Sequence, residues 1–158
     1  FAYFSQSLPS GYVLAGPNGI TIFALRSDKG RVMVEGDKWR EPFSFTRFFT
    51  FFAREGVGSP HQEIEEQKAR LRSLLAQANG EAAGQPALAE TPMDGAVVFL
   101  NPEVQLELTN PTLPVLRPDQ IKDYVRGRVK EAKVPGATQR SLNDYLAQKA
   151  VYQVEEEE

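Results

Sequence analysis

The sequence predicts an α/β domain in which a mixed sheet is flanked by helices, and three observations lead to this fold class. Residues 12 to 40 contain short apolar runs separated by turn residues, which is the pattern of strands. An amphipathic run with helical periodicity follows Ser59. A continuous apolar run, Gly95 to Leu100, comes later and is typical of a central strand buried on both faces. The length of 158 residues suits one compact domain.

A β-hairpin is predicted near the start of the chain. Tyr12 to Ala15 and Ile20 to Arg26 are apolar runs joined by Gly16 to Gly19, a Gly-Pro-Asn-Gly turn. Proline presets φ at the second turn position, and asparagine and glycine tolerate positive φ. The hairpin therefore has a local physical cause.

Two further turns extend the early sheet. Ser27 to Gly30 leads into a third run, Arg31 to Glu35, and we expect the three runs to form three consecutive antiparallel strands. Gly36 and Asp37 then turn the chain into a short strand around Trp39. We interpret this only tryptophan as a core or edge anchor, with stacking on a ligand as the alternative.

Helices are predicted mainly in the second half. Ser59 caps the first helix, Gln62 completes a capping box, and the helix ends near Asn79. The segment from Glu81 to Asp94 lacks a period and is interpreted as a surface connection. After the central strand we expect a half-buried strand, a short edge strand, a basic helix and a last amphipathic helix, at Val104 to Leu108, Val115 to Leu116, Arg117 to Lys133 and Ser141 to Val151. We divide the chain into a main domain, 1–134, and a C-terminal helix with an acidic tail, 135–158.

The first turn and several residues after it resemble a known family. Gly16-Pro17-Asn18-Gly19, Gly30, Trp39 and Pro60-His61-Gln62 stand in the order of that family's marks, which are a Gly-Pro-x-Gly turn, a glycine, a tryptophan and a Pro-x-Gln that opens a helix. The family is the nuclease-related domain, NERD, a branch of the PD-(D/E)XK nuclease superfamily, and the resemblance covers roughly residues 8 to 125. It implies a PD-(D/E)XK nuclease-like mixed sheet flanked by helices. It also implies a place for Gln62 near the active cleft, as a polar binding residue.

The chain departs from the family's motif at the catalytic positions. Gly11 stands where the resemblance implies a metal-binding Asp, and Ala24-Leu25-Arg26 stands where it implies Glu-x-Lys. A nuclease of this kind needs two carboxylates to hold Mg²⁺ and a lysine to help activate water or stabilise negative charge. Gly11 and Ala24 offer no side-chain oxygen, and Arg26 cannot act as a base because its pKa stays above about 12. We therefore predict a catalytically degenerate nuclease-like domain without a cofactor, acting as a binding or scaffolding module.

Two alternatives remain open. In the first, the domain is a metal-dependent DNA or RNA nuclease whose carboxylates have moved, and Mg²⁺ is then its cofactor. The residues of this relocated site are Asp28, Glu35, Asp37 and Lys38. In the second, the domain binds nucleic acid without cleavage, and its contacts are Arg26, Lys29 and Arg31 together with the basic helix. A solvated rim and a solvated helix face are the simpler interpretations of the same charges.

A phenylalanine cluster occupies Phe43 to Phe52, where six of the ten phenylalanines lie and no single period accounts for them. A segment this apolar can fill the core or cover one face of the sheet. Alternatively, it forms a hydrophobic patch for a protein partner or a second copy, with Phe48, Phe49 and Phe52 as contacts. Base stacking by the same rings is a third hypothesis.

Composition excludes several kinds of site and suggests a compartment. The chain has no cysteine, so disulfides and thiolate zinc sites are impossible, which fits a reducing, cytoplasmic setting. Its only histidine, His61, makes a multi-histidine metal site impossible. No apolar run reaches the roughly 20 residues that span a bilayer, so we expect no membrane partner. The chain begins at Phe1 without a signal-peptide pattern, and we expect it to belong to a longer protein.

Overall fold

The computed structural model describes residues 2–5, 8, 11–41, 59–81, 87–131 and 133–155. The strands are β1 (Ala2–Ser5), β2 (Tyr12–Gly16), β3 (Gly19–Arg26), β4 (Arg31–Glu35), β5 (Lys38–Arg40), β6 (Met93–Phe99), β7 (Gln105–Thr109) and β8 (Val115–Leu116). The helices are α2 (Pro60–Glu81), α3 (Ile121–Val129) and α4 (Gly136–Glu155), with short 3-10 helices η1 (Leu88–Glu90) and η2 (Pro118–Gln120). The fold is mixed α/β, as predicted.

The larger sheet has five strands in the order β1-β2-β3-β6-β8. β2 pairs antiparallel with both β1 and β3, whereas β3, β6 and β8 are parallel. β6 lies between β3 and β8, and its residues from Gly95 to Phe99 are all buried. The predictions of a central strand and of a short edge strand at β8 are therefore confirmed.

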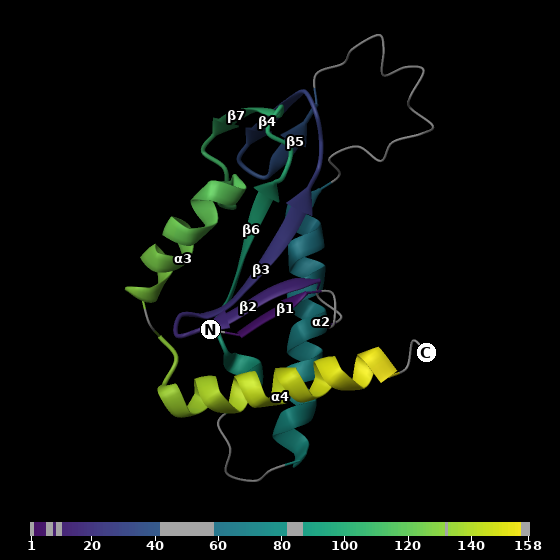
Figure 1. Ribbon diagram of the computed structural model, residues 1–158, viewed down its shortest axis with the longest axis vertical. Coiled ribbons are helices and arrows are strands. Elements are labelled where there is room, and N and C mark those ends of the chain that lie inside the picture. Colours follow the sequence, from purple (N-terminus) through teal and green to yellow (C-terminus); the bar gives the residue numbers. More distant parts are fainter. Residues whose placement is uncertain are drawn as a thin grey trace.

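The prediction of three consecutive antiparallel strands is wrong for the third one, β4. β4 pairs antiparallel with β5 and parallel with β7, in a separate three-stranded sheet. Both edges of β3 are already paired, one with β2 and the other with β6, so no edge of β3 is left for β4. The small sheet lies at one end of the large sheet in Figure 1.

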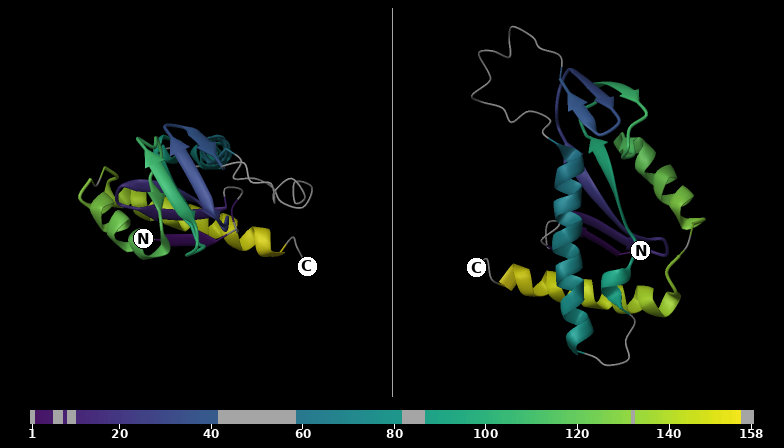
Figure 2. Two further views of the ribbon diagram at one scale, coloured as in Figure 1. Left: turned by 90° about the horizontal axis from the view of Figure 1, so that it is seen from above. Right: turned by 180° about the vertical axis from the view of Figure 1, so that it is seen from behind.

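Helices cover both faces of the five-stranded sheet. On one face, α2 and α4 share an apolar cluster with β2 and β3, and the buried helix residues of this cluster are Leu71, Leu75, Leu142 and Leu146. On the other face, α3 packs against β3 and β6 through the half-buried side chains of Ile121, Tyr124 and Val125. Figure 1 shows α2 and α4 crossing, and Figure 2 shows α3 on the opposite side of β3 and β6 from α2.

The segment after α2 is only partly the surface connection that the sequence predicted. Leu88 in η1 is 2% exposed, and Met93 begins β6. Both residues belong to the apolar cluster under α2 and α4. A 3-10 helix of three residues is too short to show a period, which is why the sequence did not reveal this contact.

Candidate functional site

Two of the three motif positions, Ala24 and Arg26, belong to β3 and lie on the face of the sheet that α2 covers. Ala24 and Arg26 are two residues apart on β3, and side chains at that spacing lie on the same face of a strand. Ala24 is 1% exposed and belongs to the same apolar cluster as Ile64 of α2. The end of β3 is therefore held directly under the first turns of α2.

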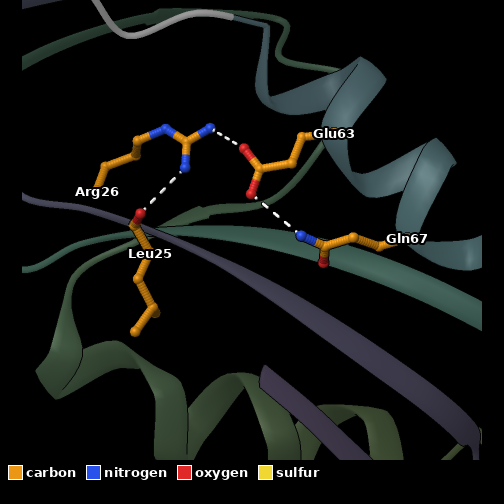
Figure 3. Close-up of polar contacts among 4 residues, drawn as sticks. All are labelled: Leu25, Arg26, Glu63 and Gln67. Carbon is orange, nitrogen blue, oxygen red and sulfur yellow. Dashed lines mark hydrogen bonds and ion pairs between the residues drawn. The ribbon is translucent and has the colours of Figure 1, made fainter. Parts of the chain in front are cut away.

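Arg26 ends β3 and forms an ion pair with Glu63 in the first turn of α2 (Figure 3). Nη2 of Arg26 donates to Oε2 of Glu63, and Nη1 donates to the carbonyl oxygen of Leu25 at 3.0 Å. The second carboxylate oxygen, Oε1 of Glu63, accepts a hydrogen bond from Nε2 of Gln67 at 3.2 Å. The Arg26 side chain is 16% exposed and that of Glu63 is 40% exposed. This polar group, which we call the Arg26–Glu63–Gln67 cluster, connects β3 to α2.

Gly11, the third motif position, lies beside the same cluster. Its φ is +68°, and a β-carbon built on it would lie 3.7 Å from both Nε2 and Oε1 of Gln67. Oε1 of Gln67 is buried and has no hydrogen-bond partner within the part of the chain that the structure describes. All three motif positions therefore border the first two turns of α2.

The sequence analysis missed the roles of Glu63 and Gln67. Gln67 is a polar residue between Ile64 and Leu71, which are both fully buried on the inner side of α2. A polar side chain on the buried face of a helix requires a hydrogen-bond partner, and Glu63 precedes Gln67 by one helical turn. This spacing is the signal that could have identified both residues.

The described residues around Arg26 do not fit the Mg²⁺ site that the family resemblance implies. Glu63 supplies a carboxylate there, but that carboxylate binds a guanidinium. Gly11 and Ala24 have no side-chain oxygen. Across the described ranges, no group of three or more His, Cys, Asp or Glu side chains is arranged to hold a metal ion.

The residues of the predicted relocated metal site are mostly spread over a solvent-facing rim. Asp28 is half-buried in the loop after β3, whereas Glu35 and Asp37 are exposed at the turn between β4 and β5. Lys38 is the direct partner of Glu35 in the antiparallel register of that turn. These four side chains form no metal-binding group with other described residues.

The cations of the nucleic-acid hypothesis lie beside carboxylates. Arg26 binds Glu63, as described above. The other two pairs join Lys29 to Glu103 at 3.9 Å and Arg31 to Glu107 at 2.5 Å. Because each positive charge has a negative neighbour, the local field that would attract phosphate is reduced.

The basic helix has similar internal pairs. Arg128, in the last turn of α3, forms ion pairs with Asp94 of β6 and with Glu131, the latter at 3.2 Å. Arg126 lies 4.0 Å from Asp123 one turn earlier on α3. Part of the predicted basic excess is therefore used within the fold.

Three other predicted binding contacts have separate positions. Gln62 is exposed on the first turn of α2. Trp39 is half-buried and stacks on Phe99, with ring centroids 6.2 Å apart and planes at 26°, which confirms its interpretation as an anchor. The segment Phe43 to Phe52, with Phe48, Phe49 and Phe52, lies outside the described residues.

One carboxyl group on the outer side of α2 has a shifted pKa. Nζ of Lys68 donates a hydrogen bond to Glu65 at 2.8 Å, and this bond lowers the pKa of Glu65. Burial acts in the opposite direction, and the charges of Lys68, His61 and Arg72 add to the lowering. The side chain of Glu65 is 53% exposed and that of Lys68 is 16% exposed, and this pair within α2 is separate from the Arg26–Glu63–Gln67 cluster.

Comparisons with known proteins leave the chain without an assigned family. No family model matches it, and no curated protein or solved structure gives a significant match. None of the helices in the described ranges is long and apolar enough to cross a membrane.

Proposed function

We propose that the chain is a PD-(D/E)XK nuclease-like domain of the NERD type that has lost its catalytic metal site and acts as a binding or scaffolding module. The support for the fold is a mixed sheet with helices on both faces, in which β3 and β6 are parallel neighbours under α2. The support for the loss of activity is chemical. Catalysis by this superfamily depends on carboxylate oxygens around Mg²⁺, and Gly11 and Ala24 supply none.

The observation that carries the proposal is the ion pair between Arg26 and Glu63. It puts a permanent positive charge next to the carboxylate of Glu63, beside the motif positions. A second positive ion at the same place would be repelled by the guanidinium, because like charges a few ångströms apart repel strongly in a partly desolvated site. We therefore assign the site to stability and not to hydrolysis.

The hydrophobic contact of such a module is the segment Phe43 to Phe52, which we propose as the surface for a protein partner or a second copy. Its support is the sequence alone, because six phenylalanines within ten residues are more apolar than a solvated loop requires. We propose that the cellular partner is a protein. Binding to nucleic acid is the alternative that the experiments test.

A cleavage assay tests the loss of activity. The purified chain is incubated with single-stranded DNA, double-stranded DNA and RNA in Mg²⁺ or Mn²⁺, beside the double variant Glu35→Ala/Asp37→Ala. We expect no cleavage by either protein. Cleavage by the wild type that disappears in the double variant would establish the relocated metal site and overturn the proposal.

A binding titration tests the nucleic-acid alternative. Labelled DNA and RNA are titrated with the chain at about 50 mM and about 200 mM salt, since phosphate contacts lose affinity steeply over this range. We expect weak binding at both concentrations, because Arg26, Lys29 and Arg31 are near carboxylates. Tight binding that falls by a factor of about 10³ or more would instead support a non-cleaving nucleic-acid binder.

A further inference from the structure

The guanidinium of Arg26 contacts two oxygens of the kind that also bind a hard cation, a carboxylate oxygen of Glu63 and the carbonyl oxygen of Leu25. Glu63 and Gln67 are four residues apart on α2, and they present a carboxylate and an amide to the end of β3. Carboxylate and amide oxygens are the ligands that hard divalent cations prefer. Here the carboxylate is bound by Arg26, while Oε1 of Gln67 is buried without a partner in the described part of the chain.

We infer that the guanidinium of Arg26 takes the place of a divalent cation, so that the contact between β3 and α2 has become independent of metal. The inference deepens the proposed function and depends on it, because a metal ion is expected at these positions only if the domain is nuclease-like. It assigns Arg26 a role that neither Gly11 nor Ala24 shares. Arg26 is the residue that prevents a cation from entering the cluster.

Arginine is suited to this role by its chemistry. Its guanidinium stays charged at every pH at which the protein is folded, and its planar set of donors binds a carboxylate in a defined direction. Nη2 reaches Glu63 and Nη1 reaches the carbonyl oxygen of Leu25, so the charge is held in place by both neighbours. With 16% of the side chain exposed, the charge is only partly screened by water.

Removing the charge of Arg26 should therefore expose a weak cation site. In Arg26→Gln, the carboxylate of Glu63 and the carbonyl oxygen of Leu25 both lose their guanidinium partner. A cation that is bound by two protein oxygens, with water molecules as its other ligands, is held weakly. The test therefore uses about 10 mM Ca²⁺ or Mg²⁺. A ligand that binds only the folded state raises the melting temperature.

The experiment compares melting temperatures in EDTA and in each cation. We expect Arg26→Gln to gain roughly 2 °C or more with Ca²⁺, and the wild type to show no gain. Arg31→Gln is the matched control, since it frees Glu107 from an ion pair of 2.5 Å on the small sheet. We expect no gain there, nor in the double variant Arg26→Gln/Glu63→Gln, which lacks the carboxylate.

Three results would overturn the inference. The first is an Arg26→Gln variant whose melting temperature does not change with either cation. The second is a wild type whose melting temperature rises as much as that of the variant. If Arg26→Gln does not fold in EDTA, its circular dichroism is followed during titration with Ca²⁺, and failure to recover the native spectrum is the third. Each result is independent of the cleavage assay, in which activity of the wild type would overturn the proposed function itself.

Discussion

Gly95 of β6 lies directly beneath Ile64 of α2, and the two residues set the closest approach of helix and sheet. A β-carbon built on Gly95 would lie 2.4 Å from Cγ2 and 3.0 Å from Cδ1 of Ile64. Ile64 is fully buried. Because α2 carries Glu63 next to Ile64, this contact also determines how far the carboxylate of Glu63 is from the end of β3.

Substitution of Gly95 by alanine should therefore destabilise the protein. The added methyl group has no space, so Ile64 and α2 have to shift, and overpacking of this kind costs about 1–3 kcal/mol. Gly127→Ala is the matched control, because a β-carbon there meets no atom within 4 Å and alanine favours the helix α3 by up to about 1 kcal/mol. Urea unfolding of both variants measures the difference, and equal stabilities would contradict this account of the helix position.

Replacing Gln67 by glutamate should weaken the polar cluster in a manner that depends on pH. Gln67 donates to Glu63 at 3.2 Å, and a second carboxylate in its place would repel Glu63 and leave one of the two charges unpaired. Repulsion raises the pKa of the introduced carboxyl group in the folded protein, so the destabilisation is present at neutral pH and decreases as the pH falls through that raised value.

The measurement is the difference in unfolding free energy between Gln67→Glu and the wild type, at pH 7 and at about pH 4.5. We expect a loss of about 1–3 kcal/mol at pH 7, because a carboxylate at this partly buried position loses hydration and has no partner of opposite charge of its own. We expect a smaller loss at the lower pH. Gln62→Glu, on the exposed side of the first turn, is the control. A loss that does not change with pH would argue against charge repulsion as its cause.

Tyr124 should make the stability of the protein fall at alkaline pH. Burial against the sheet raises the pKa of the Tyr124 hydroxyl, and the negative charge of Glu131 adds to this effect. In the unfolded chain the hydroxyl loses its proton near pH 10, whereas in the folded protein it keeps the proton to higher pH. The folded state then binds more protons, so the free energy of unfolding decreases as the pH rises above about 10.

Titration of tyrosinate absorbance and thermal unfolding at pH 9 and 11 test this expectation. Tyr124→Phe should remove a tyrosine titration step that lies above pH 10 in the folded protein, and it should reduce the loss of stability between the two pH values. Tyr145→Phe is a useful comparison, because its hydroxyl donates to the carbonyl oxygen of Leu74 at 3.0 Å on the other face of the sheet. If Tyr124→Phe and the wild type lose stability equally, the hydroxyl of Tyr124 is not the responsible group.

Local patterns in the sequence predicted those features that depend on a few neighbouring residues. The hairpin from β2 to β3 follows from the Gly16 to Gly19 turn, and α2 follows from its apolar stripe. The buried run of β6 indicated a central strand because a short, continuous apolar run is typical of a strand that is buried on both faces. The lack of a side-chain oxygen at Gly11 and Ala24 could likewise be read directly from the residue types.

Only the tertiary structure decided which distant residues meet. It pairs β3 with β6, moves β4 into a second sheet beside β7, and joins Arg26 to Glu63 across 37 positions of the chain. Parallel pairing and ion pairs of this kind depend on contacts between residues far apart in the sequence, and periodicity describes only the spacing along one element. The sequence by itself therefore determined the elements and the residue types at positions 11, 24 and 26, whereas packing of α2 on the sheet decided which side chain Arg26 meets.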